Sequence, residues 1–311
     1  MKKTFNVMKK VLITLCVMAL VFLMGTTIYY GIATHLEKDK ISDYGNRVEV
    51  LGSTINVYSV GSGERTIVLF PGYGTPSPVI DFKPVIEGLK ENYRVVVIEP
   101  FGYGLSGTTN RERTVDNIVE EMHAVLQKLE IDDFIYMGHS IAGVYGLNYF
   151  NKYPNEVKAF IGIDTSVPEQ PGGDLPVSLF RFAKKTGLVR FVTTIGDGPM
   201  LAEGLTEDEI QQMNYISQKT SMSDLMLDEL SMLTQNLENS RGLTLPQKLP
   251  VYLFLQENNT GVVNWIPMHE ASIQKSVIGK ITLIDADHYL HHTHGRFISS
   301  QTHEFIQDNI K

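Results

Sequence analysis

The decapeptide FIYMGHSIAG, residues 134–143, determines the expected fold of this 311-residue chain more than any other stretch. We expect a buried strand that ends at Met137 and a helix that starts near Ile141, which leaves room for only a very sharp turn. Residues two positions from Ser140 must be small in such a turn, as the glycine and the alanine here are. The turn would hold the hydroxyl at a helix N-terminus, where free N–H groups favour negative charge. A plain strand-to-helix turn with a capping serine is the competing interpretation.

Short apolar runs separated by helical patterns extend on both sides of this stretch. Residues 46–61 read as two alternating strands around a Gly52-Ser53 turn, an antiparallel hairpin. Six more runs have the continuous apolar character of parallel strands covered on both faces: TIVLF, RVVVI, FIYM, AFIGI, VYLFL and KITLI. Thr114 can cap the helix between the fourth and fifth strands, whose apolar stripe is Val115, Ile118, Val119, Met122, Val125, Leu126 and Leu129. The sequence predicts a doubly wound α/β domain with an eight-stranded, mostly parallel sheet and helices on both faces.

One segment, residues 168–246, breaks this alternation between the sixth and seventh strands. It holds helical patterns and no convincing strand, and Thr206 followed by Glu209 marks a helix start. We expect a helical lid over the carboxyl ends of the sheet, between a first core part, 46–167, and a second, 247–311. Its apolar residues hint at a lipophilic substrate, although such a stripe is more often core: Phe180, Phe182, Met213, Met222, Met226 and Met232.

The N-terminal segment has a different composition. A basic stretch, residues 1–10, precedes an uncharged apolar stretch, 11–34, and residues 35–45 read as a linker. At about 1.5 Å per residue, roughly two dozen helical residues span the ~30 Å hydrocarbon layer. Four preceding lysines predict a single-pass anchor with a cytoplasmic N-terminus and an extracytoplasmic domain, and Tyr29 and Tyr30 suit the interface. The alternative is a cleaved signal peptide and a secreted protein, although such a peptide has a shorter apolar region and a small-x-small exit.

Composition narrows the possible classes of ligand. The chain has a net charge of −8, and no basic cluster lies outside the N-terminus, so we expect no nucleic-acid partner. The only cysteine, Cys16, lies in the apolar stretch, which leaves no thiol nucleophile and no cysteine metal site in the domain. Gly102, Gly104 and Gly107 spell the dinucleotide fingerprint, but TTNRERT separates them from the next helix. No cofactor is implied.

Four motifs, in order and at strand ends, make nearly everything after the N-terminal segment resemble the α/β-hydrolase family. GHSIAG stands where the family has its G-x-S-x-G nucleophile elbow, with Ala142 in place of the last glycine. LFPGYG, residues 69–74, stands where the family has its His-Gly oxyanion loop, with Pro71 replacing the histidine. EPFGYGLSG, residues 99–107, looks like the loop after the fourth strand, and DADHYLHHTH, residues 285–294, like the catalytic-histidine segment.

The resemblance implies a serine hydrolase acting on a small-molecule acyl substrate. Ser140 would be the nucleophile and His288 the general base and then the general acid. The backbone N–H groups of Ile141 and Tyr73 would form the oxyanion hole. A carboxylic ester is the first choice of substrate, since amides, thioesters and lactones use the same constellation. An aspartate nucleophile would have suggested dehalogenase or epoxide chemistry, and the serine argues against both.

The acid partner of His288 has competing candidates. Most of the family places an aspartate after the seventh strand, where this chain has Asn259, which can orient the ring but lacks a carboxylate's charge. A minority carries the acid after the sixth strand. We therefore predict Asp164, with Glu257 as the alternative and a turn-capping role for Asp164 as the competing interpretation. The departures at Asn259 and Ala142 keep a second class open, a catalytically silent binding protein on the same fold.

Several further side chains need an assignment. Four histidines crowd residues 288–294, and zinc would need three or four converging ligands. Only a set with Asp285 or Asp287 would supply them, so we expect no metal site and assign the histidines other than His288 to packing or solvent. We expect His139 to be structural and Trp265 either to border the pocket or to pack.

Overall fold

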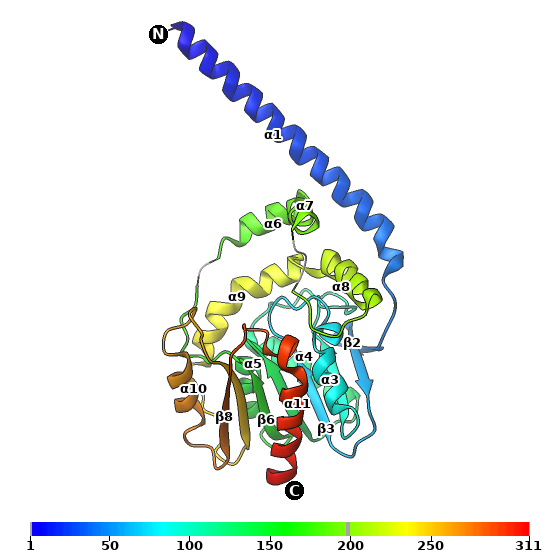
Figure 1. The fold of residues 1–311 in the computed structure, drawn as a ribbon, viewed down its shortest axis with the longest axis vertical. Helices are drawn as coiled ribbons and strands as arrows, with labels where there is room; N and C mark the ends of the chain where they lie inside the picture. The colour runs from blue at the N-terminus through cyan, green and yellow to red at the C-terminus, as the bar shows by residue number, and fades with distance from the viewer. Residues whose placement is uncertain (1, 174, 197–199, 311) are drawn as a thin grey trace.

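The structure of the protein is a computed structural model that describes residues 2–173, 175–196 and 200–310. Helix α1 (Lys2–Glu37) projects from the rest of the molecule, as Figure 1 shows. The helix Lys38–Lys40 and an extended segment then lead into an α/β core. A layer of helices lies between the core and the exposed length of α1 (Figure 1).

The core contains one eight-stranded sheet with the order β1-β2-β4-β3-β5-β6-β7-β8. Strand β2 pairs antiparallel with β1 and β4, and all other neighbours are parallel, so the predicted sheet is confirmed. The central strands are buried on both faces, which explains their continuous apolar runs. The strands are β1 (Asn46–Val50), β2 (Ser53–Val60), β3 (Thr66–Phe70), β4 (Arg94–Glu99), β5 (Phe134–His139), β6 (Val157–Ile163), β7 (Val251–Gln256) and β8 (Gly279–Ile284).

The β1–β2 hairpin turns one residue earlier than predicted. Leu51 and Gly52 form the turn, with φ values of 50° and 82°, and Ser53 already pairs with Val50. Two central residues with positive φ are typical of a type I′ turn, whose twist matches that of the flanking strands. The predicted Gly52-Ser53 turn is therefore wrong by one position.

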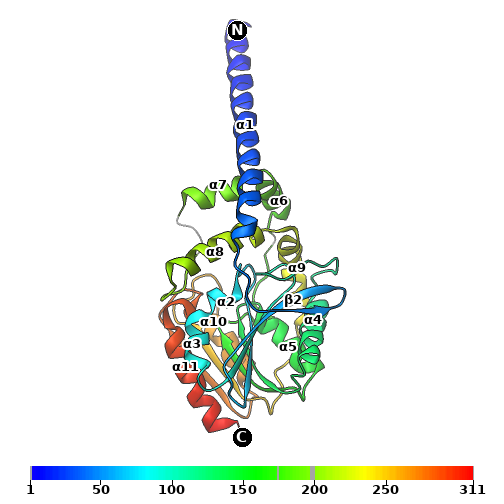
Figure 2. The same ribbon diagram turned by 90° about the vertical axis from the view of Figure 1, so that its right-hand side faces the viewer.

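Helices cover both faces of the sheet, as predicted (Figure 2). Helices α3 and α11 pack on one face, and α4 and α5 pack on the other. The Thr114 hydroxyl caps α4 by accepting from Asn117 N at 3.3 Å, and the predicted stripe of α4 is buried up to Leu126. The core helices are α2 (Pro78–Asp81), α3 (Lys83–Leu89), α4 (Val115–Lys128), α5 (Ala142–Lys152), α10 (Trp265–Ile273) and α11 (Leu290–Asn309).

Between β6 and β7 the described residues form four helices, which make up the insertion that the sequence predicts as a lid. Helices α8 and α9 lie on the core, whereas α6 and α7 lie beyond them and beside α1 (Figures 1 and 2). Thr206 and Glu209 form the predicted capping box of α8. Residues 174 and 197–199 of the predicted lid are outside the described residues. The helices are α6 (Val177–Lys185), α7 (Leu188–Ile195), α8 (Glu207–Thr220) and α9 (Asp224–Ser240).

Candidate active site

Ser140 lies in the sharp turn between β5 and α5. Its φ of 53° is in the left-handed region, so the surrounding structure must hold a strained backbone. Two bonds do so, since Ser140 N donates to Ile163 O at 3.2 Å and Ser140 O accepts from Ser166 N at 2.8 Å. A Cβ on Gly138 would lie 2.8 Å from Tyr136 Cε1 and would clash. The turn therefore requires the small residue that the sequence supplies.

His288 and Asp164 meet Ser140 from two other strand ends. The His288 Nε2 atom is 3.0 Å from Ser140 Oγ, and its Nδ1 donates to Asp164 Oδ2 at 2.7 Å. Because Nδ1 carries a proton toward the carboxylate, Nε2 of the neutral ring is free to accept the serine proton. The imidazole is 40% exposed and the Asp164 side chain is fully buried. The three side chains form one continuous hydrogen-bonded chain.

The Asp164 carboxylate has a second set of partners that sequence reasoning missed. Its Oδ1 atom accepts from Gln256 N at 2.8 Å and from the Trp265 indole Nε1 at 3.1 Å. Asp164 has a φ of 43°, which turns the chain sharply at the end of β6. A buried carboxylate is stable only when hydrogen bonds replace its water, and these donors supply them. Trp265 thus borders the site through its N–H group.

The other two candidates for the acid do not reach the imidazole. The Asn259 side chain accepts from Gly261 N and Val262 N within its own loop, both at 2.9 Å. The Glu257 side chain is exposed. Across the described part of the chain, no hydrogen bond joins either residue to His288.

The loop after β3 passes directly beside the serine. A Cβ on Gly72 would lie 2.9 Å from Ser140 Cβ and 2.6 Å from His139 Nδ1, so only glycine permits this approach. Neither the Tyr73 nor the Ile141 N–H group donates to another of the described residues. Their predicted role in an oxyanion hole stays a prediction.

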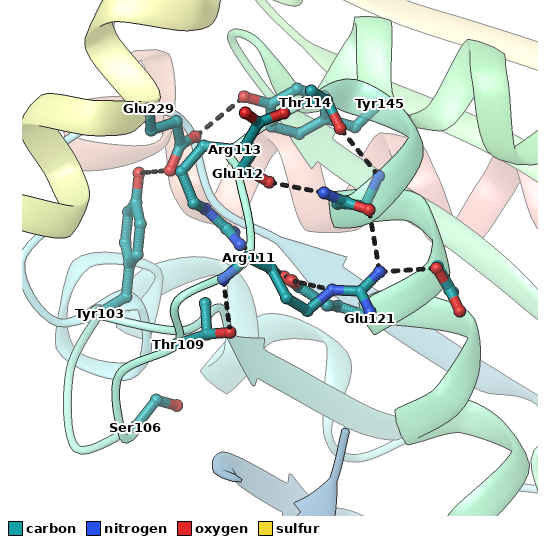
Figure 3. Close-up of polar contacts among 12 residues, drawn as sticks. Tyr103, Ser106, Thr109, Arg111, Glu112, Arg113, Thr114, Glu121, Tyr145 and Glu229 are labelled. Carbon is teal, nitrogen blue, oxygen red and sulfur yellow. Dashed lines mark hydrogen bonds and ion pairs between the residues drawn. The ribbon is translucent and has the colours of Figure 1, made fainter. Parts of the chain in front are cut away.

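A buried carboxylate of the lid contacts the same loop indirectly. Glu229 in α9 accepts from the Tyr103 hydroxyl at 3.0 Å and from the Tyr145 hydroxyl at 2.9 Å (Figure 3). The Tyr103 oxygen in turn accepts from Gly74 N at 3.3 Å. Burial raises the pKa of Glu229, and the nearby charge of Arg113 opposes this rise. Sequence reasoning missed this network because its only local signal is one acid within a lid helix.

The neighbouring histidines serve other contacts. His291 Nε2 and His292 Nε2 lie 2.7 Å and 2.8 Å from the two oxygens of Asp81. Burial by itself would raise the pKa of Asp81, but the two histidines hold it below its ordinary value. Asp285 accepts instead from Asn258 Nδ2 at 3.2 Å. The three clustered side chains are close enough to hold an ion. The hydrogen bonds to Asp81 use the Nε2 atoms of the two histidines, whereas the buried Nδ1 atom of His291 has no partner among the described residues.

His139 contacts the backbone of His288, the candidate general base. Its Nε2 atom donates to the backbone oxygen of His288 at 3.2 Å, and its side chain is buried. Burial lowers the pKa of His139 well below its ordinary value, so the ring is neutral near pH 7. This position agrees with the structural role expected for it.

Comparisons with known proteins agree with this architecture. A family model described as alpha/beta hydrolase fold matches residues 65–194. The uncharacterized protein YbdG of Bacillus subtilis (strain 168) is 29% identical over 263 residues, which are 81% of this chain and 81% of that protein. Karrikin insensitive 2 receptor IA of Petunia hybrida is 36% identical over 104 residues, which cover 31% of this chain and 36% of the receptor.

Solved structures extend the likeness to most of the chain. The haloalkane dehalogenase DbeA-M1 loop variant from Bradyrhizobium elkanii superposes with a TM-score of 0.67 and 16% sequence identity, over 85% of this chain and 96% of that chain. An identity this low shows the shared fold alone. The sheet order, the elbow at Ser140 and the match of residues 65–194 to the family model lead to one conclusion: the chain has the α/β-hydrolase fold.

Proposed function

We propose that this protein is a serine hydrolase that cleaves a carboxylic ester through Ser140, His288 and Asp164. One observation carries the proposal, the pair of hydrogen bonds at 2.7 Å and 3.0 Å that joins the carboxylate to the imidazole and the imidazole to the hydroxyl. Serine is a weak nucleophile near neutral pH and needs such an adjacent, oriented base. Asp164 is preferred to Glu257 because only Asp164 bonds to the ring.

The proposed first half-reaction acylates the enzyme. Ser140 Oγ attacks the acyl carbon while His288 Nε2 takes the hydroxyl proton, and Asp164 stabilises the resulting imidazolium. The carbonyl oxygen becomes negatively charged and accepts hydrogen bonds from the N–H groups of Tyr73 and Ile141. The loss of one such donor typically costs about 3–4 kcal/mol of transition-state stabilisation. The C–O bond to the leaving alcohol then breaks, and Nε2 returns its proton to that alcohol.

The proposed second half-reaction releases the acid. Nε2 of His288 removes a proton from water, and the hydroxide attacks the acyl carbon of the ester on Ser140. A second tetrahedral intermediate forms and collapses, the bond to Oγ breaks, and Nε2 reprotonates the serine. The 40% exposure of the imidazole is consistent with access of water to this side of the ring.

Two other functions use the same residues. An amide or thioester hydrolase needs the same three groups, and only substrates distinguish it from an esterase. A catalytically silent binding protein is the second, and the partial similarity to a protein named as a receptor gives it some support. The bonded state of all three side chains favours the enzyme, because a silent binder does not need the ring oriented at the hydroxyl.

A fluorophosphonate probe tests the proposal directly. Oγ of an activated serine displaces fluoride from the probe and keeps a covalent label. We expect labelling of the folded wild-type protein, none of Ser140→Ala and strongly reduced labelling of His288→Ala. Ser166→Ala is the matched control and should label like the wild type. A folded wild-type protein that takes no label would favour the binding protein.

The same proposal includes attachment to a membrane. In the described part of the chain, α1 is the one helix long and apolar enough to cross a bilayer, and a signal sequence would meet the same test. Lysines before it and its length support a single-pass anchor with an extracytoplasmic domain. Retention in carbonate-washed membranes with an intact N-terminus is the expected result. A shorter protein in the medium would indicate a cleaved signal instead.

A further inference from the structure

Helix α7 of the lid packs on α1 within the apolar stretch of α1. Phe191 and Phe22 meet edge to face, with ring centroids 5.2 Å apart. The Thr26 hydroxyl donates to Thr186 O at 2.8 Å, which satisfies a carbonyl at the turn before α7. A Cβ on Gly187 would lie 2.4 Å from Thr26 O, so the two backbones approach as closely as glycine allows. Small residues and backbone-directed hydroxyls are typical of helix contacts inside bilayers.

A polar contact fixes the same two helices nearer the folded domain. Arg190 of α7 forms a partly buried ion pair with Glu37, and its guanidinium lies 5.6 Å from the centre of the Tyr29 ring. Lys184 Nζ lies 5.8 Å from the centre of the Tyr30 ring. Tyrosine rings with cations beside them suit the headgroup level of a membrane.

The position of these contacts along α1 determines how deep in the bilayer they lie. If the apolar stretch enters the hydrocarbon at Val11, about 20 residues at ~1.5 Å each bring it to the opposite boundary near Tyr30. Phe22 then lies about 12 Å inside that boundary. Since Phe191 contacts Phe22, α7 must enter the outer leaflet with it, or the contact must break.

Helix α6 is amphipathic, with its polar side toward the rest of the lid and exposed apolar side chains on the side that would face the bilayer. Its polar side faces the rest of the lid: Arg181 pairs with Asp224 and Asp228 of α9, and Lys184 donates to the carbonyls of Gln218 and Ser221. Its side chains Leu179 and Phe182 are exposed on the outside. Six large apolar residues in and beside α6 and α7 are 49% to 70% exposed, namely Leu175, Leu179, Phe182, Val192, Ile195 and Met200. Such a concentration marks a surface with a partner.

We propose that α6 and α7 dock in the outer leaflet of the bilayer that α1 crosses, with the acyl chains of lipids as the occupant of this apolar surface. The inference rests on the proposed membrane anchor and is independent of the proposed catalysis. The surface continues the apolar surface of α1, and its basic residues lie at headgroup depth, as in interfacial amphipathic helices. Each exposed leucine or phenylalanine that enters the acyl region strengthens the attachment, because its apolar surface leaves water.

Fluorescent labels in the full-length chain test the docking. The native Cys16 carries the label that reports on the anchor, and on a Cys16→Ser background the label goes to Leu179→Cys, Ile195→Cys or the control Val277→Cys. Val277 is 70% exposed and belongs to the core. In nanodiscs made with brominated lipids we expect quenching at positions 16, 179 and 195, at least twofold stronger than at position 277.

The outcomes separate the two proposals. Quenching at position 16, with positions 179 and 195 quenched no more than 277, overturns the docking and leaves the anchor intact. No quenching at position 16 overturns the anchor and the docking with it. Both lid positions are more than half exposed, so the cysteine substitutions remove no core packing, and thermal unfolding of each variant checks this.

Discussion

The Tyr103 hydroxyl joins the lid to the loop after β3, since it donates to Glu229 at 3.0 Å and accepts from Gly74 N at 3.3 Å. The loop that carries the proposed Tyr73 donor is therefore oriented partly by a helix of the insertion. Tyr145 donates to the other oxygen of Glu229 (Figure 3), and no hydrogen bond among the described residues joins its side chain to this loop. The two tyrosines thus offer a matched pair of variants.

We expect Tyr103→Phe to lower kcat on a short soluble ester about fivefold to tenfold with little change in KM. It removes the acceptor of the Gly74 N–H group, and a hydrogen bond of this kind is worth about 0.5–1.5 kcal/mol. Tyr145→Phe should leave kcat within about twofold, although both variants remove one donor from Glu229 and lose similar stability. Equal effects on kcat would contradict a link between lid and loop.

The identity of the acid is decided by a second comparison. We expect Asp164→Asn to lower kcat roughly a thousandfold or more, because the amide cannot stabilise an imidazolium as the carboxylate does. Glu257→Gln and Asn259→Ala should stay within about twofold of the wild type, since neither side chain bonds to His288. Full activity of Asp164→Asn would show that the assignment is wrong. Steady-state hydrolysis of an activated ester measures all three.

The indole of Trp265 should matter through Asp164. Trp265→Phe keeps an aromatic ring but removes the Nε1 donor, which lies 3.1 Å from Oδ1. A hydrogen bond to a charged group is worth about 1.5–3 kcal/mol, so we expect kcat to fall about tenfold with KM nearly unchanged. A lower melting temperature with an unchanged kcat would show that Trp265 contributes to packing and not to the function of Asp164.

Acid should destabilise the domain through its buried imidazoles. Burial lowers the pKa of His291 below its ordinary value, so the unfolded state takes up a proton near pH 6.5 while the folded state does not. Stability from this group is therefore present above about pH 6.5 and is lost as the pH falls, by up to about 1.4 kcal/mol per pH unit. In His291→Gln the loss between pH 7.5 and 5.5 should be smaller, as measured by urea unfolding in detergent. An unchanged pH dependence would contradict this.

The parts of the site that follow from sequence are those set by local geometry. The elbow requires a small residue two positions before Ser140 and another two positions after it, and the stripe of α4 repeats at helical spacing, so both features can be recognised in a short stretch of sequence. The structure brings Asp164 to His288, and its role as the acid stays a prediction until the variants are measured. The glycines of the apparent dinucleotide fingerprint have a tertiary explanation, since a Cβ on Gly104 would lie 2.0 Å from Glu99 Oε2.

The parts that sequence did not reveal depend on contacts between distant segments. Trp265 reaches Asp164 across 101 positions, and His291 reaches Asp81 across 210. Helix α7 has the sequence LVRFVTTI, rich in β-branched residues of modest helix propensity, and it forms where it can pack on α1. No pattern within eight residues predicts that contact.

The attachment of α7 to α1 has a mechanical consequence. A lid on a freely diffusing enzyme swings over a stationary body, but here the outer helices are tied to the segment proposed to be fixed in the bilayer. Separating the lid from the core while that tie holds requires the sheet, with Ser140, His288 and Asp164, to swing away from the membrane plane. In this protein the α/β core, rather than the helices that cover it, would be the moving part.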